Sequence, residues 1–178
     1  ASFTDGNILV VKGALNNVLE KCTHVKTTSG EIADITSHLQ NIQQQYKRFS
    51  DDGYRTLGLA IKRMNTVTNI SHADEEQLTF IGFLIFSDPV KTDAIEIIQQ
   101  LKDLGIALKV ITGDNALVAK HLGQELKLEN LTVLSGKEMA TMSQDALTSR
   151  VNDIQIFAEV EPNQKERIIR ALKKSGKV

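Results

Sequence analysis

The chain has 178 residues, which is enough for one large domain or two small ones with hydrophobic cores. Its residues are 41% hydrophobic and 24% charged, near the average for a soluble globular protein, and the formal net charge of −1 argues against a nucleic-acid-binding module. Only 4% of the residues are aromatic, which argues against base stacking, and no apolar run approaches the roughly 20 residues that a membrane helix needs.

The N-terminal part of the chain predicts a strand, a helix and a hairpin. Residues 7–11 form a short β-like run, and the Lys-Gly-Ala sequence at 12–14 turns the chain into a helix of about eight residues. The apolar face of that helix comprises Leu15, Val18, Leu19 and Cys22. Runs at 25–27 and 32–34, with a Ser-Gly pair between them, are typical of a β-hairpin.

A helix and two long strands follow. Thr36 is placed to cap a helix that runs to about Ser50, in which apolar residues recur at helical spacing. Strands are expected over 56–64 and 78–86, joined by a polar loop over 65–77. Two long strands joined by one loop indicate an antiparallel pair, so this half has the pattern of an α+β domain.

From Asp88 onward the pattern changes to strands alternating with helices. Pro89 suits the first turn of a helix that Asp88 caps and Gly105 ends, with a buried stripe of Ala94, Ile97, Ile98, Leu101 and Leu104. The further elements are expected as strands at 106–111, 131–134 and 154–158, as helices at 115–127 and 162–174, and as one or two helices across 137–152. This alternation predicts a parallel sheet with helices on both faces, and hence two domains, 1–87 and 88–178.

The strongest candidate for a functional site is the Thr-Gly-Asp turn at 112–114, which joins an apolar strand to a helix. A hydroxyl, a flexible glycine amide and a helix N-terminus meet there beyond the carboxyl end of a strand, where an oxyanion such as phosphate is stabilised. The plainer alternative is that Asp114 caps the helix and Gly113 only permits the turn. Lys165, in the first turn of the last helix, either points at an anion or is an ordinary solvated lysine.

Two further cations lie beside glycines in the first half. Lys12 and Gly13 form a strand-to-helix junction, and Arg55 starts a strand, so either cation could contact a nucleotide phosphate or be surface charge beside a turn. Cys22 and His24 have no second pair of ligands, so a packed thiol is favoured over a metal site. A single cysteine also excludes an intramolecular disulfide and fits a reducing compartment.

Taken in order, five segments resemble the cytoplasmic region of P-type cation-transporting ATPases. They are V-K-G-A at 11–14, G-Y-R-T-L at 53–57, D-P-V-K at 88–91, T-G-D-N at 112–115 and F-A-E-V-E-P-N-Q-K at 157–165. The resemblance covers essentially the whole chain. The lysine of D-P-V-K looks closest to the bacterial magnesium-transporting type.

The resemblance implies a nucleotide-binding role for residues of the first half. Lys12, with Gly13, would line the ATP pocket of the nucleotide-binding domain, and Arg55 would reach the ATP phosphates. Asp88 matches the hinge where this domain rejoins the phosphorylation domain. Residues 1–87 are then the C-terminal part of a nucleotide-binding domain.

The second half would be part of a phosphorylation domain with a haloacid-dehalogenase-like, Rossmann-like α/β fold. The resemblance implies that Thr112 and Gly113 cradle the transferring phosphate, that Asp114 orients the loop, and that Lys165 neutralises the phosphate charge. We therefore expect the Thr112 hydroxyl and the Lys165 ammonium to converge on one anion-sized space at the top of the parallel sheet.

The chain also departs from the family. Leu15-Asn16 replaces the usual Pro-Glu after K-G-A, and neither D-K-T-G-T nor G-D-G-x-N-D occurs. The nucleophilic aspartate and most Mg²⁺-binding carboxylates are therefore missing, and no residue of this chain is assigned to a metal. We expect an excised fragment that is inactive by itself.

The function that the resemblance implies belongs to the full-length parent: ATP hydrolysis through an aspartyl-phosphate, coupled to transport of a cation, Mg²⁺ in the nearest subfamily. The cofactors would be ATP and Mg²⁺, and the partners would be ATP and the transmembrane and actuator domains of the same polypeptide, without nucleic acid or direct membrane contact. The location would be the cytoplasmic face of a bacterial inner membrane.

Two alternatives come from other classes. A free-standing haloacid-dehalogenase-like phosphatase would need an acidic nucleophile at the end of a first strand, and no D-x-D-type motif is found. A non-catalytic nucleotide-binding or regulatory module with a response-regulator-like fold would have a single sheet, with 78–86 as a parallel strand.

Overall fold

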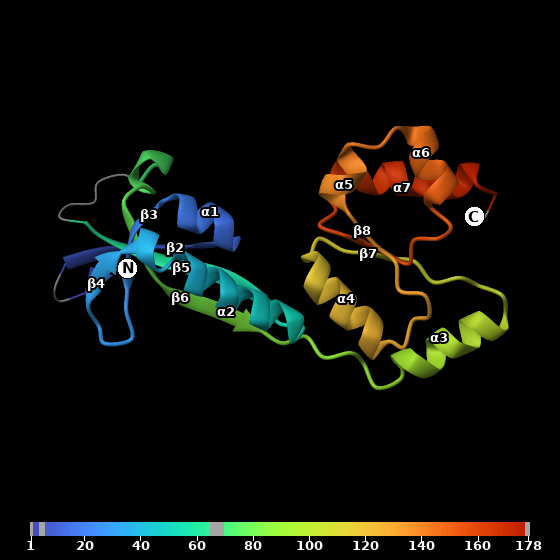
Figure 1. Ribbon diagram of the computed structural model, residues 1–178, viewed down its shortest axis with the longest axis horizontal. Coiled ribbons are helices and arrows are strands. Elements are labelled where there is room, and N and C mark those ends of the chain that lie inside the picture. Colours follow the sequence, from blue (N-terminus) through green and yellow to red (C-terminus); the bar gives the residue numbers. More distant parts are fainter. Residues whose placement is uncertain (1, 4–5, 65–69, 177–178) are drawn as a thin grey trace. The chain divides into compact units, whose positions relative to one another are not determined.

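The computed structural model describes residues 2–3, 6–64 and 70–176, and these form two compact units (Figure 1). Unit 1 comprises Ala1–Phe49 and Tyr54–Phe86, and unit 2 comprises Ser50–Gly53 and Ser87–Val178. No helix of the described ranges is long and apolar enough to cross a membrane. Each unit has its own sheet, so the structure differs from the single sheet that the regulatory-module alternative predicts.

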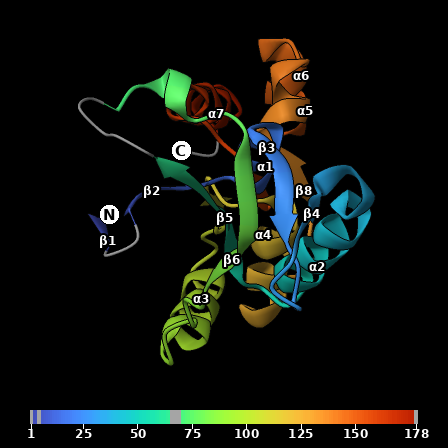
Figure 2. The ribbon, with the colours of Figure 1, turned by 90° about the vertical axis from the view of Figure 1, so that its left-hand side faces the viewer.

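Unit 1 is built on a mostly antiparallel sheet of six strands. The strands are β1 (Ser2–Phe3), β2 (Gly6–Gly13), β3 (Cys22–Lys26), β4 (Ile32–Asp34), β5 (Arg55–Met64) and β6 (Leu78–Phe86), in the order β1-β2-β5-β6-β3-β4. The antiparallel pairing of β5 with β6 and the β3–β4 hairpin confirm two sequence predictions. One pair is parallel: β3 lies beside β6, as Figure 2 shows.

Both α-helices of unit 1 pack on the same face of this sheet. Helices α1 (Leu15–Glu20) and α2 (Leu39–Asp51) share one hydrophobic core with the sheet. Its buried members are Leu15, Val18, Leu19, Cys22, Val25, Ile35, Ile42, Ala60, Leu78 and Phe80. The opposite face of β2 and β5 therefore carries no α-helix from the described part of this unit.

A glycine on β5 lets α1 approach the sheet closely. Gly13 of β2 lies directly opposite Gly58 of β5. A Cβ on Gly58 would lie 3.2 Å from the Val18 Cβ and 3.4 Å from the Leu15 Cα, whereas a Cβ on Gly13 would meet Val18 at an ordinary 3.6 Å. The glycine at 58 is thus required by packing rather than by backbone conformation.

Three predictions for unit 1 need correction. The strand expected over 7–11 continues through Gly13, because β5 offers it pairing partners as far as Gly58. Thr36 does not cap α2: it lies in a 3₁₀ turn, Ile35–Ser37, where the Asp34 side chain accepts its N–H. Cys22 starts β3 rather than continuing α1, although its thiol is buried as expected. A second 3₁₀ turn, His72–Asp74, lies in the predicted loop, whose residues 65–69 fall outside the described ranges.

Unit 2 is built on a parallel sheet of three short strands. They are β7 (Val110–Ile111), β8 (Val133–Ser135) and β9 (Ile156–Ala158), in the order β7-β9-β8. Five helices accompany them: α3 (Ala94–Asp103), α4 (Ala116–Glu125), α5 (Gly136–Ala140), α6 (Gln144–Arg150) and α7 (Pro162–Lys174). The parallel pairing is as predicted, and α7 has the bounds expected from its initial proline and apolar spacing.

The central strand β9 shows why helices cover both faces of this sheet. Ile156 and Ala158 point to a core shared with Ala119 of α4, and Phe157 between them points to a core shared with Ile168 of α7. All three β9 residues are fully buried. Figure 1 shows α4 on one side of the strands and α5, α6 and α7 on the other. Successive strand side chains alternate faces, so a strand buried on both sides reads as a continuous apolar run.

The segment from Asp88 to Leu108 is where the prediction fails most. Helix α3 begins at Ala94 with Asp93 at its N-cap, so Asp88 does not cap a helix and Pro89 does not begin one. None of its residues is buried, and Leu104 is 75% exposed, so the expected buried stripe is wrong. The predicted strand 106–111 shrinks to its last two residues. Helical spacing of apolar residues specifies a face, but that face is buried only where the described chain supplies a partner surface.

Candidate functional site

The Thr-Gly-Asp turn lies at the carboxyl end of β7 and is closed by its own side chains. The Thr112 hydroxyl donates to the Asp114 Oδ2 at 2.8 Å, and the Asp114 N–H donates to the Thr112 Oγ1 at 3.1 Å. Gly113, between them, is exposed. The turn therefore exposes Gly113 beside a hydroxyl that already has a partner.

The helix after this turn is capped by Asn115 and not by Asp114, which corrects the plainer alternative. The Asn115 Oδ1 accepts the N–H groups of Leu117 and Val118, both at 3.0 Å, and α4 starts at Ala116. Asp114 is consequently available to close the turn with Thr112.

Backbone hydrogen bonds fasten the turn to the segment between β9 and α7. Thr112 donates its N–H to the Phe157 carbonyl at 2.9 Å and accepts the Val160 N–H at 3.0 Å. The Asp114 carbonyl accepts the Glu159 N–H at 2.8 Å. Since Pro162 begins α7 two residues after Val160, the 112–114 turn and the start of α7 lie at the same edge of the sheet.

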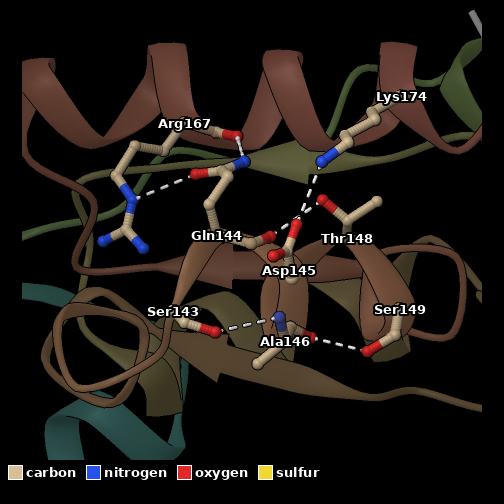
Figure 3. A network of polar contacts seen from close by, with 8 residues as sticks. All are labelled: Ser143, Gln144, Asp145, Ala146, Thr148, Ser149, Arg167 and Lys174. Carbon is tan, nitrogen blue, oxygen red and sulfur yellow. Dashed lines mark hydrogen bonds and ion pairs between the residues drawn. The ribbon is translucent and has the colours of Figure 1, made fainter.

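Lys165 lies in the first turn of α7 and is exposed. The inward face of this helix is fixed by its neighbours: the Arg167 guanidinium donates to the carbonyls of Met139 (3.3 Å) and Met142 (2.8 Å). Figure 3 shows Arg167 and Gln144 bonded in both directions, Nε to Oε1 at 3.5 Å and Nε2 to the Arg167 carbonyl at 3.2 Å. Lys165 thus stands on a helix that is hydrogen-bonded to neighbouring segments through Arg167, and its convergence with the Thr112 hydroxyl remains a prediction.

Positive and negative groups meet at this edge of the sheet, where the carboxylates of Asp114, Glu159 and Glu161 lie beside two helix N-termini and one lysine. Helices α4 and α7 both begin here, and a helix N-terminus carries roughly half a positive charge on its unpaired N–H groups. Lys165 adds a full positive charge. Helix α5 also starts at this end of the sheet. Its Glu138 carboxylate accepts hydrogen bonds from Ser135, and these lower the pKa of Glu138; the bond from the Ser135 backbone N–H has the larger effect and the bond from its hydroxyl the smaller.

The cations predicted in unit 1 lie on one face of its sheet. Lys12 is directly opposite Leu59 on β5, and cross-strand partners share a face. Arg55 is four residues from Leu59 and therefore on that same face, roughly 13 Å away along the strand. Both side chains are exposed, and this face is the one without α1 and α2.

The other candidate residues of the sequence analysis each lie in a different part of the chain. Gly13 pairs with Gly58 on the helix-covered face, where a Cβ on Gly13 would make only an ordinary 3.6 Å contact with Val18. Asp88 is exposed in a segment without regular secondary structure. The Cys22 thiol donates to the Val18 carbonyl at 3.1 Å, and burial raises its pKa to about 11. Within the described residues, no group of three or more His, Cys, Asp or Glu could hold a metal ion.

Three residues near the turn were missed as site candidates. Glu159 has a left-handed backbone (φ 55°), Gln164 bonds across to Gly136, and Gly136 has no space for a Cβ. The glutamate and glutamine lie inside the predicted motif 157–165, but neither the positive φ nor a contact across 28 residues leaves a periodic pattern in the sequence.

Comparisons with known proteins agree on one family. A family model described as P-type ATPase, cytoplasmic domain N, matches residues 2–93. The magnesium-transporting ATPase, P-type 1, of Salmonella typhimurium is 32% identical over 94% of this chain and 19% of its own length. The Escherichia coli K12 protein of the same name is 33% identical over 100% of this chain and 20% of its own length. The calcium-transporting ATPase 1 of Bacillus cereus is 31% identical over 99% of this chain and 20% of its own. The chain spans about a fifth of the length of these curated relatives.

Proposed function

This chain belongs to the P-type ATPase family, and from that premise we propose that it is the ATP-binding and phosphate-binding part of a cation pump. The parent protein would hydrolyse ATP through an aspartyl-phosphate and move a cation across a membrane. Magnesium is the cargo named for the two relatives that are 32% and 33% identical, and we propose it here as the substrate ion.

The hydrogen-bonded pairing of the 112–114 turn with residues 157–160 carries the phosphate half of this proposal. It supports a cradle in which the Gly113 N–H and the Thr112 hydroxyl donate to phosphate oxygens while Lys165 neutralises their charge. Phosphoryl transfer depends on such positioning and charge stabilisation. Because the Thr112 hydroxyl donates to Asp114 in this structure, the incoming phosphate would have to replace that hydrogen bond.

The nucleotide half rests on the shared face of Lys12 and Arg55 in unit 1. A cation on β5 and another on β2, offset by roughly 13 Å in the strand direction, suit a molecule with a polyphosphate at one end and a base at the other. Leu57 and Leu59 lie on the same face of β5 as Arg55, and they offer apolar surface for the base or ribose. We assign residues 1–87 to a nucleotide-binding domain and 88–178 to a phosphorylation domain of haloacid-dehalogenase-like type.

The described residues do not by themselves fit the Mg²⁺ ion that accompanies ATP in this family. They include no group of three or more potential ligands, and Mg²⁺ requires several oxygen ligands. We therefore derive no step through the metal, and we propose that the chain lacks ATPase activity on its own. Phosphate release at a catalytic rate from the purified chain would contradict this.

The test of the nucleotide half is an NMR titration of the chain with ATP. We expect amide shifts on β2 and β5 around Lys12 and Arg55, with a dissociation constant in the millimolar range, about −4 kcal/mol. Arg55→Ala should abolish the shifts, whereas Arg48→Ala, on α2 and the other face of the sheet, should leave them unchanged. Equal effects of the two arginine substitutions, or binding confined to the α2 face, would overturn the assignment.

A further inference from the structure

We propose that Gln164 and Gly136 are positioning residues that hold the turn 159–161, and through it the 112–114 turn, in the arrangement that phosphate binding needs. This inference rests on the proposed function, because it concerns the same phosphate site. It assigns a task to two residues that touch neither the phosphate nor the nucleotide.

Gln164 joins two separate segments with the two ends of one side-chain amide. Its Oε1 accepts the Glu161 N–H at 3.0 Å, and its Nε2 donates to the Gly136 carbonyl at 2.9 Å. The first bond is an ordinary helix-start contact, but the second reaches the β8–α5 junction. The neutral amide accepts one bond and donates the other, so an ionised carboxylate at 164, which has no donor, would keep the first contact and lose the second.

Gly136 leaves room for this arrangement because it has no side chain. A Cβ at 136 would clash with the Glu159 carbonyl oxygen and would lie 2.5 Å from the Gln164 Oε1. Gly136 is buried, and its φ is not in the left-handed region, so close approach rather than backbone conformation explains the glycine. Any larger residue would push the 159–161 turn away from β8.

Glu159 shows what this support achieves. Its left-handed φ of 55° costs about 1–3 kcal/mol for a residue other than glycine, so surrounding contacts must maintain it. In that conformation the consecutive N–H groups of Glu159 and Val160 donate to the carbonyls of Asp114 and Thr112. The Gln164–Gly136 contact supports the 159–161 turn, and that turn holds the turn that carries Thr112 and Gly113.

The experiment compares amide hydrogen exchange and phosphate binding in the 178-residue chain. Gln164→Met keeps the length of the side chain and removes both hydrogen bonds, Gln164→Glu removes only the donor, and Gly136→Ala introduces the clash. Gln99→Met is the matched control, because the Gln99 amide donates to Asp103 within the same helix, α3. Inorganic phosphate is titrated while the Gly113 amide shift is followed.

We expect Gln164→Met to speed hydrogen exchange of the Glu159 and Val160 amides about tenfold and to weaken phosphate binding about tenfold. Gln164→Glu should have a smaller effect on both quantities, and Gln99→Met should have none. Unchanged amide exchange in both Gln164 variants would overturn the inference, whether or not their phosphate affinity changes. Faster exchange with unchanged phosphate affinity would show a merely structural contact and also overturn it. If the unmodified chain shows no phosphate-induced shift at Gly113, the proposed phosphate site itself is wrong, which the exchange data alone would not reveal.

Discussion

Unit 1 carries Lys12 and Arg55 on strands of eight and ten residues, whereas unit 2 carries its candidate residues on a turn and in a helix that follow strands of two and three residues. Long paired strands fix the face and spacing of every side chain on them, because alternation and register leave no freedom. Short strands fix only where a turn begins. In unit 2 the rest is set by hydrogen bonds between turns and by helix caps.

The difference teaches where each unit is sensitive to substitution. In unit 1 the vulnerable positions are those where a helix touches the sheet, since the strand register already holds the candidate cations. In unit 2 they are the buried β9 strand, from which both faces of the sheet are packed, and the side chains that hold the turns.

The largest effect is expected for Phe157→Ala in the centre of unit 2. Phe157 is fully buried in β9, so the substitution leaves a cavity and should lower the free energy of unfolding of this unit by about 3–5 kcal/mol. Phe86→Ala, at the 49% exposed end of β6 in unit 1, is the matched control and should cost far less. Urea unfolding followed by NMR signals of each unit gives both values. Similar costs for the two phenylalanines would contradict the assignment of β9 as the core strand.

The second prediction uses Cys22 as a probe of the core of unit 1. Burial raises the pKa of its thiol to about 11, which lowers the thiolate fraction at pH 8 about 100-fold relative to an ordinary cysteine. Alkylation should therefore be about 100-fold slower in the folded chain than in urea. Because the folded-state pKa exceeds the unfolded-state value, the thiol's contribution to stability is complete below about pH 9 and lost as the pH rises toward 11.

Alkylation kinetics and pH-dependent unfolding check this prediction. A Cys22→Ala variant should lose the thiol's contribution to the decline in stability between pH 9 and 11. Rapid labelling of folded protein at pH 8, or an identical decline in the alanine variant, would show that the thiol is not held in the core.

Much of unit 1, and some of unit 2, could be predicted from the sequence. The alternation along β5 places Arg55 and Leu59 on one face, and the initial proline and apolar spacing of α7 give its bounds. The start of α3 could not be predicted, because Asp88-Pro89 is compatible with a helix start but both residues are exposed in the structure, and the helix begins at Ala94 instead. The Gln164–Gly136 contact could not be predicted either, since it depends on a left-handed residue and on a partner 28 positions away.

The third prediction concerns close packing in unit 1. Gly58→Val would force α1 away from β5 and should destabilise unit 1 by about 1–3 kcal/mol. Gly13→Ala, on the directly paired glycine, should be nearly neutral because its Cβ would make only an ordinary contact with Val18. Thermal or urea unfolding of the two variants is compared with the unmodified chain. The reverse order of effects would mean that α1 lies over β2 instead of β5.

The smallest effect is expected at the cap of α4 in unit 2. Asn115→Ala removes the acceptor for two N–H groups and should cost about 1 kcal/mol, while Asn115→Asp keeps that acceptor and should cost less. Urea unfolding gives the difference. If Asp114→Ala, and not Asn115→Ala, frayed the first turn of α4 in hydrogen exchange, Asp114 would be the cap after all.

The central claim is that the 112–114 turn and Lys165 bind one phosphate together. A crystal structure of the chain grown with inorganic phosphate tests it most directly. The account predicts a phosphate within hydrogen-bonding distance of the Gly113 N–H, the Thr112 hydroxyl and the Lys165 ammonium. A structure in which Lys165 points away from the turn, or in which phosphate at saturating concentration binds elsewhere and leaves Gly113 bare, would contradict it.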